Sequence, residues 1–282
     1  MGAEMLTIRK AAALTGVPEH TLRAWERRYD LLHPARTPSG YRVYDEAEVA
    51  RIAEMHRLVQ AGWSPRAAAA EVALGRPGDD GPDPYAELVD AAAALDAEAV
   101  SRVVIDHFSR APFEAVVDHW LMPALDRVGR AWAAGEVSVA GEHLVANVVT
   151  RRMYVTYDAT PHRHGDRPVL IGAPPAVDHQ LGLLAFAVAA SRAGLPTVYL
   201  GAQVPLDAWT DAAARLRPRS AVIAVPRKRD AASATRVVDV LSAEPAVPVW
   251  VGGRYQHLVG APERRLGHAI GPAADRLATE DA

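Results

Sequence analysis

The chain has 282 residues and no cysteine, so neither a disulfide framework nor a thiolate metal site can form. It carries 31 lysines and arginines against 34 aspartates and glutamates, and the net charge of −3 gives no overall reason to expect nucleic-acid binding. No apolar run approaches the length of a membrane span and no signal peptide opens the sequence, which predicts a cytoplasmic protein of roughly two domains without a membrane partner.

The N-terminal end departs from this average charge. Residues 1–44 hold seven basic and four acidic side chains. Apolar residues from Ile8 to Leu14 predict a short helix and Gly16 predicts a turn. Pro18 predicts the first position of a second helix, where its missing N–H costs nothing. This succession is typical of a helix-turn-helix, and a pair of ordinary solvated helices is the alternative.

The second predicted helix and the segment after it supply side chains suited to DNA. Leu22 and Trp25 can face inward, which leaves arginine and threonine for phosphate and base-edge contacts in a major groove. A turn centred on Gly40 follows, and Asp45 predicts the N-cap of the next helix.

This N-terminal segment resembles the MerR superfamily, in which a winged helix-turn-helix is followed by a Gly-Tyr-Arg-x-Tyr sequence and a further helix pair. The matching motifs are Thr15-Gly16-Val17, Thr21-Leu22-Arg23, Trp25-Glu26-Arg27-Arg28 and Gly40-Tyr41-Arg42-Val43-Tyr44. The resemblance implies that residues 1–74 are a DNA-binding domain whose partner is a double-stranded operator. The side chains that it implies for DNA contact are Thr21, Arg23, Arg27, Arg28, Arg36, Tyr41 and Arg42.

Two joints divide the rest of the chain. Residues 75–84 are dense in glycine, proline and aspartate and predict a linker. Residues 85–160 show apolar side chains at helical spacing, which favours a bundle of about four helices. A second joint at residues 158–168 contains His162 and His164, for which a solvated joint is a better interpretation than a metal site.

In residues 167–282 short apolar runs alternate with helical stretches, which predicts a flavodoxin-like (Rossmann-like) parallel α/β domain. The short runs PVLIGAP, PTVYLGA, SAVIAVP and VPVWVGG read as strands, in a sheet of about five, with helices predicted over 182–192, 206–216 and 231–241. Gly194 is placed to end the first of these helices. The predicted fold is thus multidomain, α followed by α/β, and ligands of such a sheet bind beyond the carboxyl ends of its strands.

Two groups of residues in these domains are candidates for ligand binding. Gly135 and Gly141 lie between Trp132 and the neighbouring pair Glu142–His143. Because glycine weakens a helix, they predict that one helix ends near Trp132 and another begins near Gly141. A flat aromatic ring beside a carboxylate and an imidazole could cap a large planar ligand, and ordinary packing is the alternative. His179 stands at a strand-to-helix junction, where a neutral imidazole can bind a transition metal, and a solvated loop residue is the alternative.

The combination resembles cobalamin-binding domains: a helical bundle, a flavodoxin-like domain, a His-x-x-Gly sequence after the first strand and a double glycine after the fourth. The spacing Trp-x9-Glu-His resembles the bundle of the cobalamin-dependent MerR-type photoreceptors (the CarH/LitR group), in which this cluster covers the upper face of adenosylcobalamin. The resemblance implies cobalamin as cofactor, adenosylcobalamin above other forms, and His179 as the ligand of its metal. The implied cofactor-binding residues are Trp132, Val139, Glu142, His143, His179, Gly182, Gly252 and Gly253.

Three residues depart from this pattern. Val177 stands where the family has a carboxylate two residues before the histidine, and the loss of that carboxylate is expected to weaken the cobalt–nitrogen bond. Asp178 is adjacent to the histidine instead. Pro226 begins a sequence that lacks the hydroxyl expected after the third strand. Ala133 replaces the histidine that binds cobalt after photolysis in light-sensing members.

Two functions follow from these observations. The first is a DNA-binding transcriptional regulator, expected to be a repressor, that is controlled by cobalamin and by light. The alternative is a MerR-type regulator whose degenerate cobalamin-like domain is a ligand-independent oligomerisation or protein-interaction module. A homo-oligomer, dimer or tetramer, is expected from the bundle and the α/β domain. We assign no catalytic residue and expect no enzyme, because no segment can supply a substrate domain.

Overall fold

The computed structural model describes residues 5–29, 31–37, 41–60, 65–73, 83–160, 167–243, 246–260 and 262–280. The chain divides into two compact units. The first comprises Met1–Trp120 with Ala124–Val137, and the second comprises Leu121–Pro123 with Ser138–Ala282. The predicted turn at Gly40, residues 75–82 of the predicted linker and the histidines His162 and His164 of the second joint lie outside the described residues.

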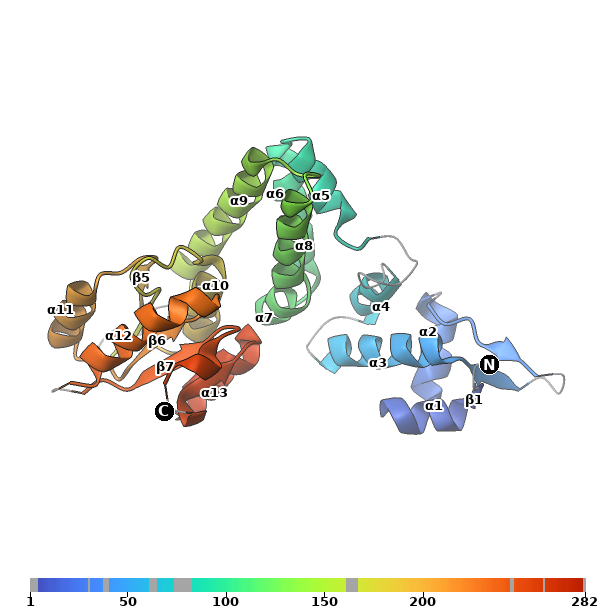
Figure 1. Ribbon diagram of the computed structural model, residues 1–282. Helices are drawn as coiled ribbons and strands as arrows, with labels where there is room; N and C mark the ends of the chain where they lie inside the picture. The colour runs from blue at the N-terminus through green and yellow to red at the C-terminus, as the bar shows by residue number, and fades with distance from the viewer. Residues whose placement is uncertain are drawn as a thin grey trace. The chain divides into compact units, whose positions relative to one another are not determined.

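The N-terminal part of the first unit combines helices with a small antiparallel sheet of order β1-β3-β2 (Figure 1). Its elements are β1 (Leu6–Thr7), α1 (Ile8–Thr15), α2 (Glu19–Tyr29), β2 (Ala35–Arg36), β3 (Arg42–Tyr44), α3 (Glu46–Gln60) and α4 (Pro65–Ala73). In the hairpin of β2 and β3, Ala35 pairs with Val43 and Arg36 with Arg42.

The boundaries of α1 and α2 follow from local chemistry. The Thr7 hydroxyl accepts a hydrogen bond from the backbone N–H of Lys10 and caps α1, which ends at Gly16 in a left-handed conformation that glycine adopts without strain. The prediction for Pro18 is wrong by one position. Its carbonyl accepts hydrogen bonds from the N–H groups of Thr21 and Leu22, so it precedes the first helical residue.

Two predictions for this part are confirmed. Leu22 and Trp25 are buried, 0% and 5% exposed, on the inner side of α2. Asp45 caps α3, because its carboxylate accepts a hydrogen bond from the Glu48 N–H at 2.7 Å, and the Glu48 carboxylate accepts one from the Asp45 N–H at 3.3 Å. This reciprocal pair is a capping box, which satisfies two backbone donors at the start of a helix.

The remaining helices of the first unit cover most of the segment that predicts a bundle. They are α5 (Ala86–Ala93), α6 (Ala97–Arg110), α7 (Phe113–Val116), the π-helical turn η1 (Val117–Leu121) and α8 (Met122–Ala133), whose first two residues belong to the second unit. The Asp96 carboxylate caps α6 by accepting from the N–H groups of Glu98 and Ala99. Pro123 has no N–H to donate, and a proline ring in a helix crowds the carbonyl four residues earlier, so the wider π turn that ends at Leu121 accommodates this proline.

The second unit contains the parallel sheet that the sequence predicts, preceded by α9 (Val139–Asp158). The order along the chain is β4 (Val169–Gly172), α10 (Leu181–Arg192), β5 (Thr197–Gly201), α11 (Leu206–Leu216), β6 (Ser220–Ala224), α12 (Ala231–Leu241), β7 (Val249–Gly252), β8 (Arg265–Gly267) and α13 (Ile270–Glu280), with short 3-10 turns at Lys228–Asp230, Gln256–Leu258 and Pro262–Arg264. The strands pair in the order β5-β4-β6-β7-β8, all parallel. This is the doubly wound arrangement of flavodoxin-like domains.

Helices cover both faces of this sheet, as Figure 1 shows from β4 in yellow-green to α13 in red. On one side α10 contacts both α13 and α9, and on the other α11 contacts α12. The latter side holds a buried cluster in which Trp209 of α11 and Val237 of α12 meet Ile223 and Val251 of the sheet. Burial on both faces explains why the strands read as continuous apolar runs. No helix of the described residues is long and apolar enough to cross a membrane.

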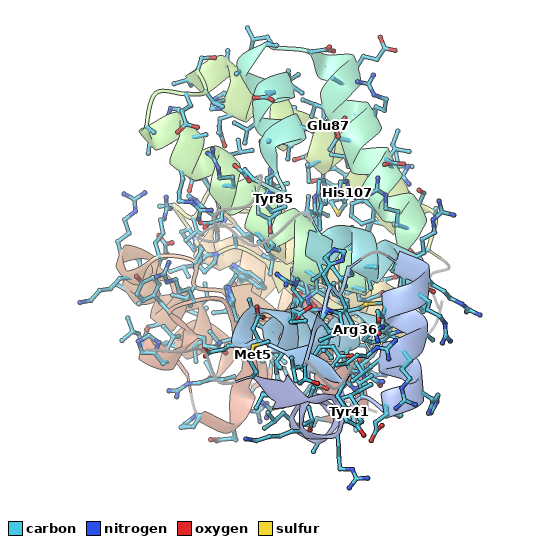
Figure 2. All side chains as sticks on the ribbon, turned by 90° about the vertical axis from the view of Figure 1, so that its right-hand side faces the viewer. Met5, Arg36, Tyr41, Tyr85, Glu87 and His107 are labelled. Carbon is cyan, nitrogen blue, oxygen red and sulfur yellow. The ribbon has the colours of Figure 1, made fainter. Side chains whose placement is uncertain are left out.

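One buried histidine of the first unit is stacked on an aromatic ring. His107 of α6 is 6% exposed, and its ring lies 3.7 Å from that of Trp120 with an interplanar angle of 11°. Its Nδ1 is hydrogen bonded to the carbonyl of Val103 at 2.9 Å. Figure 2 shows this side chain among the green helices. Burial lowers the pKa of His107 below its ordinary value of 6.5, and the hydrogen bond to Val103 opposes this shift.

We expect this burial to make stability pH-dependent. As the pH falls below about 6.5, the unfolded chain takes up a proton at His107 before the folded chain does. The contribution is therefore present above that pH and is lost as the pH falls towards the folded-state pKa. His107→Phe, which keeps a ring on Trp120, should flatten this dependence in urea unfolding measured above and below pH about 6.5. An equal loss of stability with acid in both proteins would contradict the assignment.

Candidate cofactor site and DNA-contacting surface

His179 lies at the carboxyl edge of the parallel sheet, in the loop of residues 173–180 between β4 and α10. Because β4 pairs with β5 on one side and β6 on the other, this loop sits where the strand order changes direction. Such a switch point is where ligands of open α/β sheets bind. The His179 side chain is 54% exposed, as a side chain must be to reach a ligand.

The imidazole of His179 is hydrogen bonded to the carboxylate beside it. Its Nδ1 donates to Asp178 Oδ1 at 2.8 Å, and Arg227 Nη2 donates to the same oxygen at 2.8 Å. The hydrogen bond from His179 and the nearby Arg227 charge lower the pKa of the Asp178 carboxyl from 3.8 to about 2, against desolvation. The side chain of Asp178 therefore faces the histidine. His179 thus has a carboxylate partner although position 177 is a valine, and the expected weakening of the cobalt–nitrogen bond stays a prediction.

Backbone hydrogen bonds tie this loop to its neighbours. The N–H of Gln203 donates to the carbonyl of Val177 at 3.1 Å, and the N–H of Val204 donates to the carbonyl of Ala173 at 3.0 Å. Val177 itself is 1% exposed, so its side chain belongs to the core. Ala176 and Gln203 both have positive φ, 63° and 53°, which is uncommon for residues other than glycine.

The double glycine after β7 has two different structural roles. Gly253 has a φ of 92°, and a Cβ atom there would lie 3.0 Å from the carbonyl oxygen of Val225. A side chain is thus excluded by both backbone conformation and space. A Cβ at Gly252 would meet no atom of the described residues within 4 Å, so among them this residue leaves open space beside the end of β7. Gly182, in the first turn of α10, has only the end of Met122 nearby, at 3.5 Å.

The Glu142–His143 pair lies in the first turn of α9. This helix starts at Val139, two residues before the predicted start near Gly141, because the Ser138 hydroxyl caps it by accepting from the Gly141 N–H at 3.1 Å. Nδ1 of His143 is 2.6 Å from Glu142 Oε2. Val139 is 56% exposed and the His143 side chain 70% exposed, so the start of α9 presents an accessible surface.

Trp132 lies at the end of α8, as the sequence predicts, and is 50% exposed. It belongs to the first compact unit, whereas Glu142, His143 and His179 belong to the second. Within the second unit, α9 spans about 30 Å from its first turn to its last. At its last turn the Tyr157 hydroxyl is hydrogen bonded to Thr197 at the amino end of β5. The structure therefore pairs Glu142 with His143 and places His179 in a separate loop.

Sequence reasoning missed Arg227, which donates to Asp178, and Asp230, which accepts from Arg227. Arg227 follows β6 and Asp230 ends the next 3-10 turn, and the Asp230 carboxylate caps that turn by accepting from the Arg227 backbone N–H through Oδ2 at 3.1 Å. A carboxylate three residues after the start of a turn is a recognisable signal for such a cap. The link from Arg227 to Asp178, 49 residues earlier, has no local signal.

The residues expected to contact DNA from α2 share its exposed side. At 100° per residue, Thr21, Arg23, Arg27 and Arg28 fall on the side opposite the buried Leu22. The Thr21 side chain is half-buried, and the side chains of Arg23, Arg27 and Arg28 are exposed. The Arg23 guanidinium is 3.1 Å from the Glu19 carboxylate one turn earlier. This ion pair is exposed and contributes little to stability.

The hairpin supplies the other three residues. Arg36 and Tyr41 are exposed, Tyr41 by 72%, and both lie on the blue N-terminal part of the chain in Figure 2. Arg42 is engaged differently, because its Nε donates to both carboxylate oxygens of Glu26 in α2 at 2.7 and 3.0 Å. This hydrogen bond raises the pKa of Arg42. Arg42 thus fixes β3 against α2.

Comparisons with known proteins agree with both halves of this description. Residues 6–73 match the model of the MerR HTH family regulatory proteins, and residues 85–156 match that of the B12 binding domain. The chain is 34% identical over 276 residues to the HTH-type transcriptional repressor CarH of Myxococcus xanthus, covering 90% of each protein. It is also 34% identical to the HTH-type transcriptional repressor CarA of the same organism over 257 residues, which are 88% of this chain and 86% of CarA.

A solved structure supports the fold. The monomethylamine corrinoid protein of Methanosarcina barkeri superposes with a TM-score of 0.53 at 16% identity, covering 70% of this chain and 96% of that one. The family models and the relatives define a MerR-type DNA-binding regulator with a cobalamin-binding domain, as the sequence predicts. The chain belongs to the family of CarH and CarA.

The two glycines after β7 provide a matched test of the site's geometry. Gly253→Ala should destabilise the cofactor-free protein by about 1–3 kcal/mol, because alanine is strained at this φ and its Cβ meets the backbone of Val225. Gly252→Ala should be tolerated, since its Cβ enters open space. Urea unfolding of the full chain measures both, and equal midpoints for the two variants would contradict the difference.

Proposed function

We propose that the protein is a transcriptional repressor that holds adenosylcobalamin through His179 and releases or binds its operator according to the state of that cofactor. The observation that carries this proposal is the imidazole at the switch point of the sheet, with Nδ1 bonded to Asp178. The similarity to the transcriptional repressors CarH and CarA supports the regulatory part.

The residues at the carboxyl edge fit a cobalamin. A metal-bound histidine normally donates its second N–H to a carboxylate, and His179 has this arrangement. The open space at Gly252 suits a bulky group that lies close to the backbone, which is the role proposed for the double glycine. When bound, the cofactor supplies a cobalt–carbon bond that light can break.

The chain's own residues have separate proposed tasks. His179 would bind the metal through Nε2 while Asp178 holds the proton on Nδ1. Glu142 and His143, paired at the start of α9, together with Trp132 and Val139 would cover the other face of the cofactor. Their exposure in the cofactor-free chain supports such a covering role, because each has surface to bury.

Control of DNA binding is proposed to run through assembly of several copies. A single winged helix-turn-helix offers few contacts, and joining two or more raises the avidity for paired half-sites. We propose that the cofactor-holding domains form a dimer or tetramer. Sizing chromatography with and without adenosylcobalamin tests this, and an identical mass in both states would contradict ligand-controlled assembly.

Binding of adenosylcobalamin through His179 can be measured directly. Titration with adenosylcobalamin in the dark should produce the absorbance spectrum of a histidine-ligated form, and His179→Ala should abolish that spectrum. His268→Ala removes another exposed histidine of the same unit and should leave it unchanged. No binding by the wild type would instead favour the ligand-independent interaction module.

The proposal also includes a response of the bound cofactor to light. Ala133 has no atom that can bind a metal, so after illumination we expect no spectrum of two histidine ligands and a weaker or more reversible response. Ala133→His should add that spectrum. If the wild type already shows it, loss of the spectrum in His143→Ala would identify His143 as the second ligand.

Operator binding by the N-terminal domain can be tested with two arginine variants. Arg23→Ala should weaken operator binding by about 1–3 kcal/mol if this arginine contacts a base edge, and binding should fall steeply with salt because phosphate contacts release counterions. Arg215→Ala is a matched control, since Arg215 is also exposed and paired one turn away, with Asp211. Equal affinities of the two variants for a footprinted operator would contradict the role of Arg23.

A further inference from the structure

His179 is the exposed end of a chain of hydrogen-bonded side chains. Asp178 Oδ1 accepts from His179 Nδ1 and from Arg227 Nη2, both at 2.8 Å. Arg227 also donates from Nε to Asp230 Oδ2 at 3.0 Å and from Nη2 to Asp230 Oδ1 at 3.3 Å. The guanidinium therefore bridges two carboxylates, one from each of two loops at the carboxyl edge of the sheet.

The bridge is anchored at its inner end. The side chain of Asp230 is 4% exposed and that of Arg227 is 24% exposed, whereas that of Asp178 is 61% exposed. The Arg227 backbone N–H also donates to Asp230, so Asp230 holds this arginine at both its backbone and its guanidinium group. A carboxylate as exposed as that of Asp178 would otherwise rotate freely into water. Arg227 is the group that keeps it beside the imidazole.

We propose that Asp178, clamped by Arg227, is the positioning residue for His179. The pair keeps the imidazole proton on Nδ1 and leaves the lone pair of Nε2 for a metal, since the hydrogen bond at one ring nitrogen decides the state of the other. This inference rests on the proposed function for its ligand. It assigns to Asp178 and Arg227 the task of the carboxylate that is absent at Val177.

The first experiment measures the tautomer of His179 in the cofactor-free full chain. Nitrogen-15 shifts of labelled histidines distinguish an N–H nitrogen from one that carries a lone pair, and His179→Gln assigns the signal. The spectra are recorded in alkaline buffer, because a tautomer is defined only for an imidazole that carries a single ring proton. The wild type should be mainly the Nδ1–H form.

Four variants test what holds that tautomer. Asp178→Ala and Arg227→Gln should shift His179 towards the Nε2–H form, and Asp178→Asn, which keeps an acceptor oxygen, should shift it less than alanine does. Arg229→Gln removes the same charge two residues away from Arg227. The Arg229 side chain is 73% exposed and its Nε is 4.0 Å from Asp230, so this control should match the wild type. A predominantly Nε2–H wild type, or no shift in Arg227→Gln, would overturn the inference.

The second experiment titrates the same variants with hydroxocobalamin and follows absorbance. Asp178→Ala should weaken histidine-ligated binding about 10–100-fold, Arg227→Gln should weaken it by a smaller factor, and Arg229→Gln should not change it. Tighter binding by Arg227→Gln would mean that the guanidinium only withdraws charge from Asp178, which overturns its positioning role.

The two experiments separate this inference from the proposed function. If the wild type binds no hydroxocobalamin but Arg227→Gln shifts the tautomer, the proposed function fails and the positioning of His179 stands. If the wild type binds through His179 and the Arg227→Gln tautomer is unchanged, the positioning fails and the proposed function stands.

Discussion

Parallel pairing of β4 with strands on both of its sides is the constraint on which the candidate cofactor site depends. Parallel strands end at a common edge, so the loops after β4, β6 and β7 meet there although they are far apart in the chain. The β4 loop brings His179 and Asp178, the β6 loop brings Arg227, and the end of β7 brings the double glycine. A different strand order would separate the imidazole from the guanidinium that holds its carboxylate.

Much of this arrangement could be predicted from the sequence. Apolar runs that end in small residues predict strands buried on both faces, and the helices over 206–216 and 231–241 lie where their periodicity indicates. The place of His179 follows from this alternation alone, because a residue just after the first strand of a doubly wound sheet lies at the switch point.

The side-chain chemistry of the site could not be predicted in the same way. The direction of Asp178 depends on Arg227, which comes from another loop, and no local pattern encodes a contact between residues so distant in the chain. The departure of Val177 from the family pattern is visible in the sequence, but the hydrogen bonds that place Asp178 beside His179 are not. The same limit applies to Arg42, which reads as a free basic residue and is engaged by Glu26 across the DNA-binding domain. The assignment of the cofactor-binding and DNA-contacting residues stays a prediction.

The backbone of the His179 loop has a consequence for how a ligand is received. Ala176 and Gln203 adopt left-handed conformations that cost a non-glycine residue about 1–2 kcal/mol each. Gln203 is the donor of the hydrogen bond to the Val177 carbonyl, and Ala176 directly precedes its acceptor. The sheet and its neighbouring loops must offset this strain when the chain folds. Most of the ordering of the loop is then complete before any ligand arrives, so the site is preorganised. Under the proposed function, binding would lose little conformational entropy at His179, which favours tight capture by a single imidazole.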